Sequence, residues 1–256
     1  MLLSTRWLRL VERNALVYRH VWPVLVAGLV EPFLYLLSIG YGIGGLVGSV
    51  QVGNQALPYA VFVAPALVAT AAMNGAIYDT TFSVLHKLRY ERIYDTMLTT
   101  SLSPRDIAVG EVSWAMVRGC IYTAAMLVIT TAFGLTPLPW ALSMLPAALL
   151  ITFCFAAIGC AVTTFLRSWQ DIENVYLVQT VIFLFSGTFL PVDRYPTAIR
   201  WLTELSPLTR GTDLLRGLNT GAPGVALSVV DVLFLAIIGV IGLRIAIRRL
   251  GRLILT

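Results

Sequence analysis

Six long apolar runs constrain the fold of this chain more than any other feature. A helix needs about 20 mainly apolar residues to cross a hydrocarbon core of roughly 30 Å, because each residue rises about 1.5 Å. Six runs pass this test, at residues 21–47, 57–80, 107–133, 140–166, 172–191 and 225–247. None alternates as a barrel strand does, and each is far longer than the roughly 10 residues of such a strand. The sequence therefore predicts an all-α polytopic membrane protein with six transmembrane helices, in a single domain over residues 1–256.

Composition excludes an ordinary soluble domain. Hydrophobic residues make up 58% of the chain and charged residues 12%, whereas soluble domains are about half apolar and about a quarter charged. The pI of 9.3 requires no nucleic-acid partner, because positive charges at one membrane face and anionic lipid headgroups account for it. Membrane lipid is thus an expected partner and nucleic acid is not.

The arginines set the expected orientation, because cytoplasmic loops retain positive charge. With both termini inside, the external segments hold only Arg194, Arg200, Arg210 and Arg216. The external loops around residues 48–56 and 134–139 carry no charge. We therefore expect both termini to be cytoplasmic.

The first twenty residues predict a helix lying in the inner membrane surface. Arg6, Arg9 and Arg13 fall on one face of a 3.6-residue helix, opposite an apolar face that includes Trp7 and Val11. This pattern is typical of an interfacial amphipathic helix. The arginines also interrupt any apolar core of a signal peptide. A solvated basic leader is the alternative interpretation.

The polar segment between the second and third runs predicts a short amphipathic cytoplasmic helix. Apolar residues recur there at helical spacing among charges of both signs, and Ser103-Pro104 ends the pattern. Tyr94 and Leu98 would anchor the helix on a soluble partner, and Arg92 and Asp95 would fix its register. A helix that merely lies on lipid fits the periodicity equally well.

The segment after the fifth run predicts two short external helices. They cover residues 196–205 and 207–218, and each begins at a proline, which the first helical turn tolerates. Apolar residues such as Trp201 and Leu202 alternate with charges there, as expected of a cap folded back into the outer leaflet.

Motifs for phosphate, metal or nucleophilic chemistry are absent from the sequence. Lys87 is the single lysine and lacks the glycines before it and the Ser or Thr after it that a phosphate-binding loop needs. Cys120, Cys154 and Cys160 fall inside predicted spans without the close pairing of a metal site, so they are interpreted as small buried hydrophobic residues. We therefore expect no catalytic residue and no metal site, and no ATP hydrolysis by this chain alone.

Polar side chains inside the runs are the functional candidates, because charge within a span is expensive. They are Glu31, Asn74, Asp79, Glu111, Arg118 and Asp231. Glu111 and Arg118 are seven residues apart and lie on one helix face. Glu31 and Glu111 allow a proton relay; the alternatives are simple pairing with Arg118 and capping of the backbone that Pro32 frees.

Four segments together, by their order and spacing, resemble the pattern of a known transporter family. The resemblance covers the whole length of the chain. The four segments are Glu31-Pro32 with Gly40-Tyr41-Gly42-Ile43-Gly44, Pro65-Ala66-Leu67 with Met73 and Asn74, Arg92-Ile93-Tyr94-Asp95-Thr96-Met97-Leu98 with Gly110 and Glu111, and Ser186-Gly187-Thr188-Phe189-Leu190-Pro191 with Pro207 and Arg216. The chain resembles the membrane subunit of ABC-2 type exporters, in particular the nodulation-factor (lipochitooligosaccharide) export permeases and the daunorubicin-resistance type permeases.

The resemblance implies a six-helix domain in the bacterial inner membrane that pairs with a second copy or a sister chain. Each half would dock on a separate ABC ATP-binding subunit. The chain would bind no cofactor itself, and ATP and Mg would sit on that partner. Segment 89–99 would be the coupling helix, and its contacts would come from Arg89, Arg92, Tyr94, Asp95 and Leu98.

Members of the resembled family export drugs, lipids, polysaccharides or glycolipids, so the resemblance leaves the cargo open; we expect an amphiphile, which is a drug (antibiotics included), a lipid or a glycolipid. Amphiphilic cargo needs aromatic surface with a few polar groups. Beside Asn74, the predicted substrate path is lined by Met73, Phe183, Phe185 and Phe189. Ordinary helix packing explains the same residues.

An ion-coupled secondary transporter is the rival class. It would be driven through the intramembrane carboxylates Glu31, Glu111 and Asp231. No inverted repeat is apparent between the two halves of the sequence, which argues against this class. A membrane-embedded enzyme ranks third.

Overall fold

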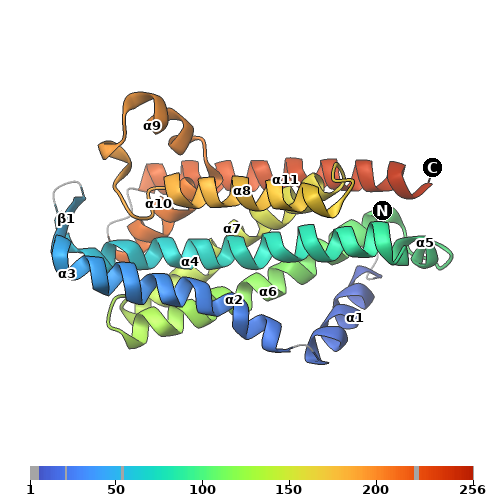
Figure 1. Ribbon diagram of the computed structural model, residues 1–256, viewed down its shortest axis with the longest axis horizontal. Coiled ribbons are helices and arrows are strands. Elements are labelled where there is room, and N and C mark those ends of the chain that lie inside the picture. The colour runs from blue at the N-terminus through green and yellow to red at the C-terminus, as the bar shows by residue number, and fades with distance from the viewer. Residues whose placement is uncertain (1–5, 21, 53–54, 222–224, 256) are drawn as a thin grey trace.

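The computed structural model describes residues 6–20, 22–52, 55–221 and 225–255. Most of them lie in helices that run along one long axis (Figure 1). The first half of the chain forms α1 (Trp7–His20), α2 (Trp22–Tyr35), α3 (Gly44–Val47), α4 (Tyr59–Tyr78), α5 (Ile93–Leu98) and α6 (Pro104–Ala132). The second half forms α7 (Leu138–Thr163), α8 (Trp169–Phe185), a 3₁₀ turn (Val192–Arg194), α9 (Thr197–Glu204), α10 (Pro207–Asn219) and α11 (Val225–Leu255).

Two of the long helices continue through π-helical turns. Leu36–Ile43 joins α2 to α3, and Asp79–Ser83 and His86–Tyr90 extend α4. A π turn disturbs the regular i→i−4 hydrogen bonding, so its carbonyls need other donors. The Thr163 hydroxyl of α7 donates to the Thr80 carbonyl at 2.6 Å. The second span therefore continues well past residue 80, where the sequence predicted its end.

Within the described ranges, five helical stretches are long and apolar enough to cross a membrane. They are Gly28–Val47, Tyr59–Tyr90, Pro104–Ala132, Leu138–Thr163 and Ser228–Ile254. The predicted span at 172–191 is not among them, because α8 has 17 residues and ends at Phe185. The chain turns at Gly187, whose φ of +73° is a conformation that favours glycine. The polytopic helical class is confirmed, whereas the number of six spans is not.

A small β-hairpin departs from the all-α prediction. β1 (Ser49–Val52) pairs antiparallel with β2 (Gln55–Pro58) in the connection between the first and second spans. Val50 lies opposite Leu57 in this register. Valines alternate with Ser49 and Gln51 along β1, and β-branched residues at alternate positions favour a strand over a loop.

α4 forms the centre of the bundle. Nearly all of its side chains are buried, and it packs against α6, α7 and α10. At its crossing with α6, a Cβ on Gly75 would lie 3.0 Å from the Gly119 Cα. Small residues let membrane helices approach this closely, so the pair brings the polar side chains of α4 and α6 within reach of each other.

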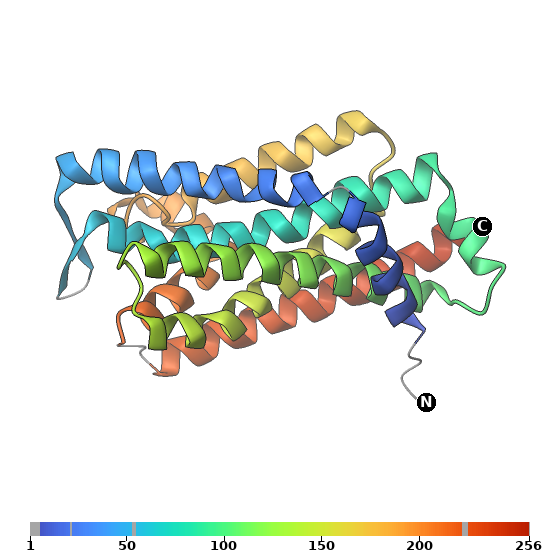
Figure 2. The same cartoon turned by 90° about the horizontal axis from the view of Figure 1, so that it is seen from below.

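The two ends of the bundle carry different elements. α1, α5 and the C-terminus lie at one end, and β1 and α9 lie toward the other (Figure 1). α1 crosses the bundle axis at a steep angle (Figure 2) and packs on α6, burying Leu10 and Asn14. Residues 1–5 of the predicted interfacial helix lie outside the described residues.

Two short helices, α9 and α10, occupy the segment where the sequence predicts them. α10 is packed into the bundle against α4, α7 and α11, with Leu208 and Leu215 fully buried. α9 instead exposes Trp201 and Leu202. Only α9 therefore has the outward apolar face expected of a cap.

Candidate functional site

Four buried side chains tie α1, α4, α5 and α6 together at the α5 end of the bundle. We call Asn14, Lys87, Tyr94 and Glu111 the Lys87 cluster. Lys87 Nζ lies 2.8 Å from Glu111 Oε2. Asn14 Nδ2 donates to the same oxygen at 3.1 Å, and the Tyr94 hydroxyl donates to Glu111 Oε1 at 3.0 Å. Lys87 also donates to Asn14 Oδ1 at 3.2 Å. Every member of the cluster is thus hydrogen-bonded to Glu111.

Local backbone features position these four groups. Lys87 lies on the π-helical extension of α4, and Arg92 then turns the chain in a left-handed conformation with φ of +49°. This turn brings Tyr94 back toward the bundle. Glu111 lies in the first half of α6, whose start is fixed by a capping box between Ser103 and Asp106.

Burial makes the members of the Lys87 cluster dependent on one another. The Glu111 side chain is 3% exposed and that of Lys87 is 10% exposed. Charges at such depth are tolerated when they are paired and fully hydrogen-bonded. Burial and the negative charge of Glu111 raise the pKa of Tyr94 well above its ordinary value. The Tyr94 hydroxyl therefore remains protonated and donates its hydrogen to Glu111.

A second buried group, the Arg118 cluster, consists of Tyr18, Asp79, Arg118 and Tyr122. Arg118 Nη1 lies 2.7 Å from Asp79 Oδ1, and the Tyr18 hydroxyl donates to the same oxygen. Arg118 Nε and Nη2 donate to the Tyr122 hydroxyl at 3.1 and 2.8 Å. The guanidinium also lies 4.6 Å from the ring centroid of Tyr78. Asp79 Oδ2 is buried and has no hydrogen-bond partner among the described residues.

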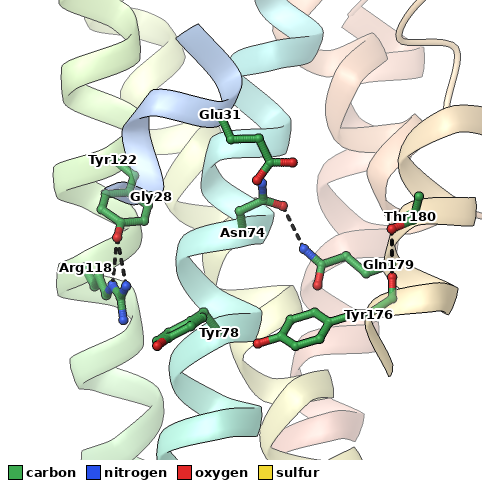
Figure 3. A pocket seen from close by; sticks show the side chains of 9 residues that line it. All are labelled: Gly28, Glu31, Asn74, Tyr78, Arg118, Tyr122, Tyr176, Gln179 and Thr180. Atoms are coloured by element: carbon green, nitrogen blue, oxygen red, sulfur yellow. Dashed lines mark hydrogen bonds between the residues drawn. The ribbon is translucent and has the colours of Figure 1, made fainter. Parts of the chain in front are cut away.

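A polar cavity of about 370 Å³ opens beside the Arg118 cluster. Figure 3 shows its walls, which come from α2, α4, α6 and α8: Gly28, Glu31, Asn74, Tyr78, Arg118, Tyr122, Tyr176, Gln179 and Thr180. Gln179 donates to Asn74 Oδ1 at 2.7 Å across the cavity. Tyrosine rings, two carboxamides, a carboxylate and a guanidinium thus surround one space within the bundle.

The structure separates two charges that the sequence places on one helix face. Glu111 pairs with Lys87 and Arg118 pairs with Asp79, so the alternative in which Glu111 pairs with Arg118 does not hold. Glu111 and Arg118 are two helical turns apart on α6. The extension of α4 places Lys87 opposite Glu111 and Asp79 opposite Arg118. Glu31 is exposed beside the cavity in this single chain, and Asp231 pairs with Arg210 at 3.3 Å.

The predicted coupling residues divide into an inward and an outward set. Tyr94 is 1% exposed and is bonded to Glu111, so it is not free to anchor a soluble partner. Leu98 packs against the apolar cluster that contains Leu10 and Ile107. The outward set is exposed and consists of Arg89, Arg92 and Asp95. The predicted helix is also shorter than 89–99, since α5 covers Ile93–Leu98.

Three of the predicted substrate-path residues lie inside the bundle. Met73 is fully buried in the core. Phe183 and Phe189 pack on each other with ring centroids 5.1 Å apart, and both contact Tyr35. Phe185 is partly exposed and lies beside Tyr195. None of the four lines the polar cavity, whereas Asn74 does.

Sequence reasoning missed several residues of both clusters. Asn14 and Tyr18 are one helical turn apart on α1, and both face the bundle rather than lipid. Their spacing was a usable signal, because two polar groups at i and i+4 share a helix face. Lys87 had a signal of its own, as the single lysine of an arginine-rich chain. Tyr122 had none.

Comparison with known proteins gives one consistent result. A family model described as ABC-2 type transporter matches residues 5–219. Nodulation protein J of Rhizobium leguminosarum bv. trifolii is 32% identical over 222 residues, which cover 86% of this chain and 83% of that protein. Nodulation protein J of Rhizobium meliloti (strain 1021) is 29% identical, over 85% of this chain and 82% of that protein. These matches confirm the resemblance that the sequence motifs predicted, and the chain belongs to the ABC-2 type transporter family.

Proposed function

We propose that this chain is the permease subunit of an ATP-driven exporter that moves an amphiphile out of the cytoplasm or the inner leaflet. The observation that supports this most directly is the Lys87 cluster. It joins a short helix outside the spans, α5, to α4, α6 and α1 through one buried carboxylate. Such a junction suits a permease that receives movement from a soluble ATPase at α5.

ATP and Mg would be bound by a separate ABC subunit docked on α5. The exposed residues Arg89, Arg92 and Asp95 would contact it, whereas Tyr94 and Leu98 would transmit its displacement to the spans. ATP binding would draw two such helices together and open the two membrane halves outward. The ion-coupled alternative is not supported, because Glu111 and Asp231 are each paired with a cation on different parts of the bundle.

Reversing the exposed charges of Arg92, just before α5, and Asp95, within it, should detach the ATP-binding subunit. The double variant Arg92→Glu with Asp95→Lys places like charges opposite each other at the interface, which costs several kcal/mol. We expect co-purification of the ATPase to fall at least tenfold and transport to fall with it. The melting temperature of the permease should not change, since both side chains are exposed.

Arg200→Glu is the matched control, because Arg200 is an exposed arginine on α9 at the other end of the bundle. Its co-purification should equal that of the wild type. Full retention of the ATPase by the α5 double variant would refute docking on this helix.

The second half of the transporter would be another copy or a sister chain, paired along α2 and α8. Exposed apolar side chains recur at one-turn spacing on both helices, namely Val26, Val30 and Leu34 on α2 and Leu177, Val181 and Leu184 on α8. The polar cavity lies between these two helices and has exposed Glu31 beside it. Pairing there would enclose the cavity as a substrate path, in which tyrosines and carboxamides would meet the polar part of the cargo.

The arginine-rich α5 end would face the cytoplasm of a bacterial cell, with both termini inside. In a variant whose native cysteines are replaced, Thr197→Cys should react with an impermeant maleimide in intact cells. Ser101→Cys should react only after permeabilisation. Both positions are exposed, so reactivity reports sidedness. Labelling of Ser101→Cys in intact cells would reverse the orientation.

A further inference from the structure

A long apolar groove lies between α7 and α8, on the other side of α8 from the polar cavity. Its volume is about 740 Å³, within the range of small-molecule sites. Its walls include Phe155, Ile158 and Val162 on α7 and Val175, Val178 and Ile182 on α8. Gln179 is the one lining residue that it shares with the polar cavity. The two spaces are therefore separate sites.

Three arginines gather around one end of this groove. Arg167 lines it directly, in the turn between α7 and α8. Arg89 donates from Nη2 to the carbonyl of Leu166 at 3.4 Å, and Arg249 of α11 lies 3.7 Å from the ring centroid of Phe165. Leu166 and Phe165 both line the groove. Three separate parts of the chain thus bring positive charge to the same mouth.

Counter-charge for these arginines is scarce in the described structure. No described carboxylate lies within ion-pair distance of Arg89, Arg167 or Arg249. Asp171 also lines the groove mouth, but its Oδ2 accepts the backbone N–H groups of Arg167 and Ser168 at 2.7 and 3.0 Å. That carboxylate caps α8 and offsets one of the three positive charges, so the mouth keeps a net positive charge.

We propose that the groove is a binding site for an anionic phospholipid of the inner leaflet. One acyl chain would lie between α7 and α8, and the phosphate would meet Arg167 with Arg89 and Arg249 nearby. The proposal uses the orientation given above, in which this end of the bundle is cytoplasmic. Basic pockets between membrane helices on that side suit anionic lipid headgroups.

Charge and polarity together select this occupant. A soluble anion would leave the apolar walls uncovered, and an apolar helix of a second copy would leave the three arginines without counter-charge. A phospholipid supplies an apolar chain and a phosphate in one molecule. Its site would be distinct from the substrate path, so binding should not depend on transport.

The test measures lipid binding to the delipidated permease in mild detergent by native mass spectrometry. Phosphatidylglycerol and phosphatidylcholine with identical acyl chains are compared. We expect preferential retention of phosphatidylglycerol and about fivefold weaker binding after Arg167→Gln, since each basic residue near a headgroup contributes roughly that factor. Arg244→Gln is the matched control, because Arg244 is an exposed arginine of α11 that does not line the groove. It should bind as the wild type does.

A second variant tests the groove itself without changing charge. Val178→Trp fills the space from α8, and the position is half-exposed, so the larger ring is accommodated. Phosphatidylglycerol binding should fall at least fivefold while the melting temperature and the oligomeric mass stay unchanged. Equal retention of the two lipids, or wild-type binding by either variant, would show ordinary annular lipid only. A changed oligomeric mass after Val178→Trp would assign the groove to a protein interface instead.

Discussion

Replacing Glu111 by alanine should lower the stability of the permease by about 3–5 kcal/mol, the usual cost of removing one partner of a buried ion pair. The change leaves the Lys87 ammonium buried with Asn14 as its remaining acceptor. It also removes the acceptor of the Tyr94 hydroxyl. For a chain of this size, 1 kcal/mol shifts the melting temperature by about 2–4 °C, so the midpoint in detergent should fall by roughly 10 °C.

The double variant Lys87→Met with Glu111→Leu distinguishes loss of folding from loss of coupling. Replacing a whole buried ion pair by apolar residues is often neutral or stabilising. We therefore expect the double variant to recover most of the wild-type melting temperature. ATP hydrolysis by its complex should nevertheless drive less transport, because the bond from Tyr94 to Glu111 no longer links α5 to α6. If the recovered double variant transports as the wild type does, the cluster is structural only.

The sequence predicted the helical membrane class because the bilayer demands long apolar runs with internally satisfied backbones. Five stretches follow this rule closely. The fifth predicted run is not confirmed as a span, because hydropathy does not register a turn: Ser186 and Gly187 are compatible with an apolar window, yet α8 ends at Phe185 and Gly187 has a positive φ. The hairpin was not predicted because β1 and β2 have four residues each, which is too short for an alternating pattern to be recognised.

The sequence predicted some of the residues of the candidate site, but it did not predict which of them pair with each other. The cost of burying charge marked Glu111 and Arg118 as important, and both are buried. Their partners Lys87 and Asp79 lie on a different helix, and helix rotation about its own axis decides which charges meet. A single sequence indicates which residues share one face of a helix. It does not indicate how two helices cross, and so it does not indicate which of their residues meet. Tyr94 is a second example. The sequence predicted that its side chain anchors a soluble partner, whereas in the structure it is buried and bonded to Glu111.

Replacing Arg118 by alanine should have an effect as large as the Glu111 change, about 3–5 kcal/mol. The Arg118 side chain is 2% exposed, and its guanidinium is hydrogen-bonded to Asp79, Tyr18 and Tyr122. Without it, Asp79 keeps only the Tyr18 hydroxyl, and its second oxygen already lacks a partner among the described residues. We expect a strongly reduced yield of folded protein and a melting temperature lowered by roughly 10 °C.

Arg210→Ala is the matched control for this prediction. Arg210 also pairs with an aspartate of a span, Asp231, but its side chain is 29% exposed, so water can replace the lost partner. The Asp231 side chain is 7% exposed, so the pair is partly buried, and its loss should cost clearly less than the loss of Arg118 but more than the loss of an exposed pair. Arg118→Lys adds a second comparison, because lysine keeps the charge but lacks the planar fork that serves Asp79 and Tyr122 at once. It should recover part of the stability lost in Arg118→Ala. Equal melting temperatures for Arg118→Ala and Arg210→Ala would contradict a central structural role for the Arg118 cluster, and the cavity wall it supports would then have to be held by helix packing alone.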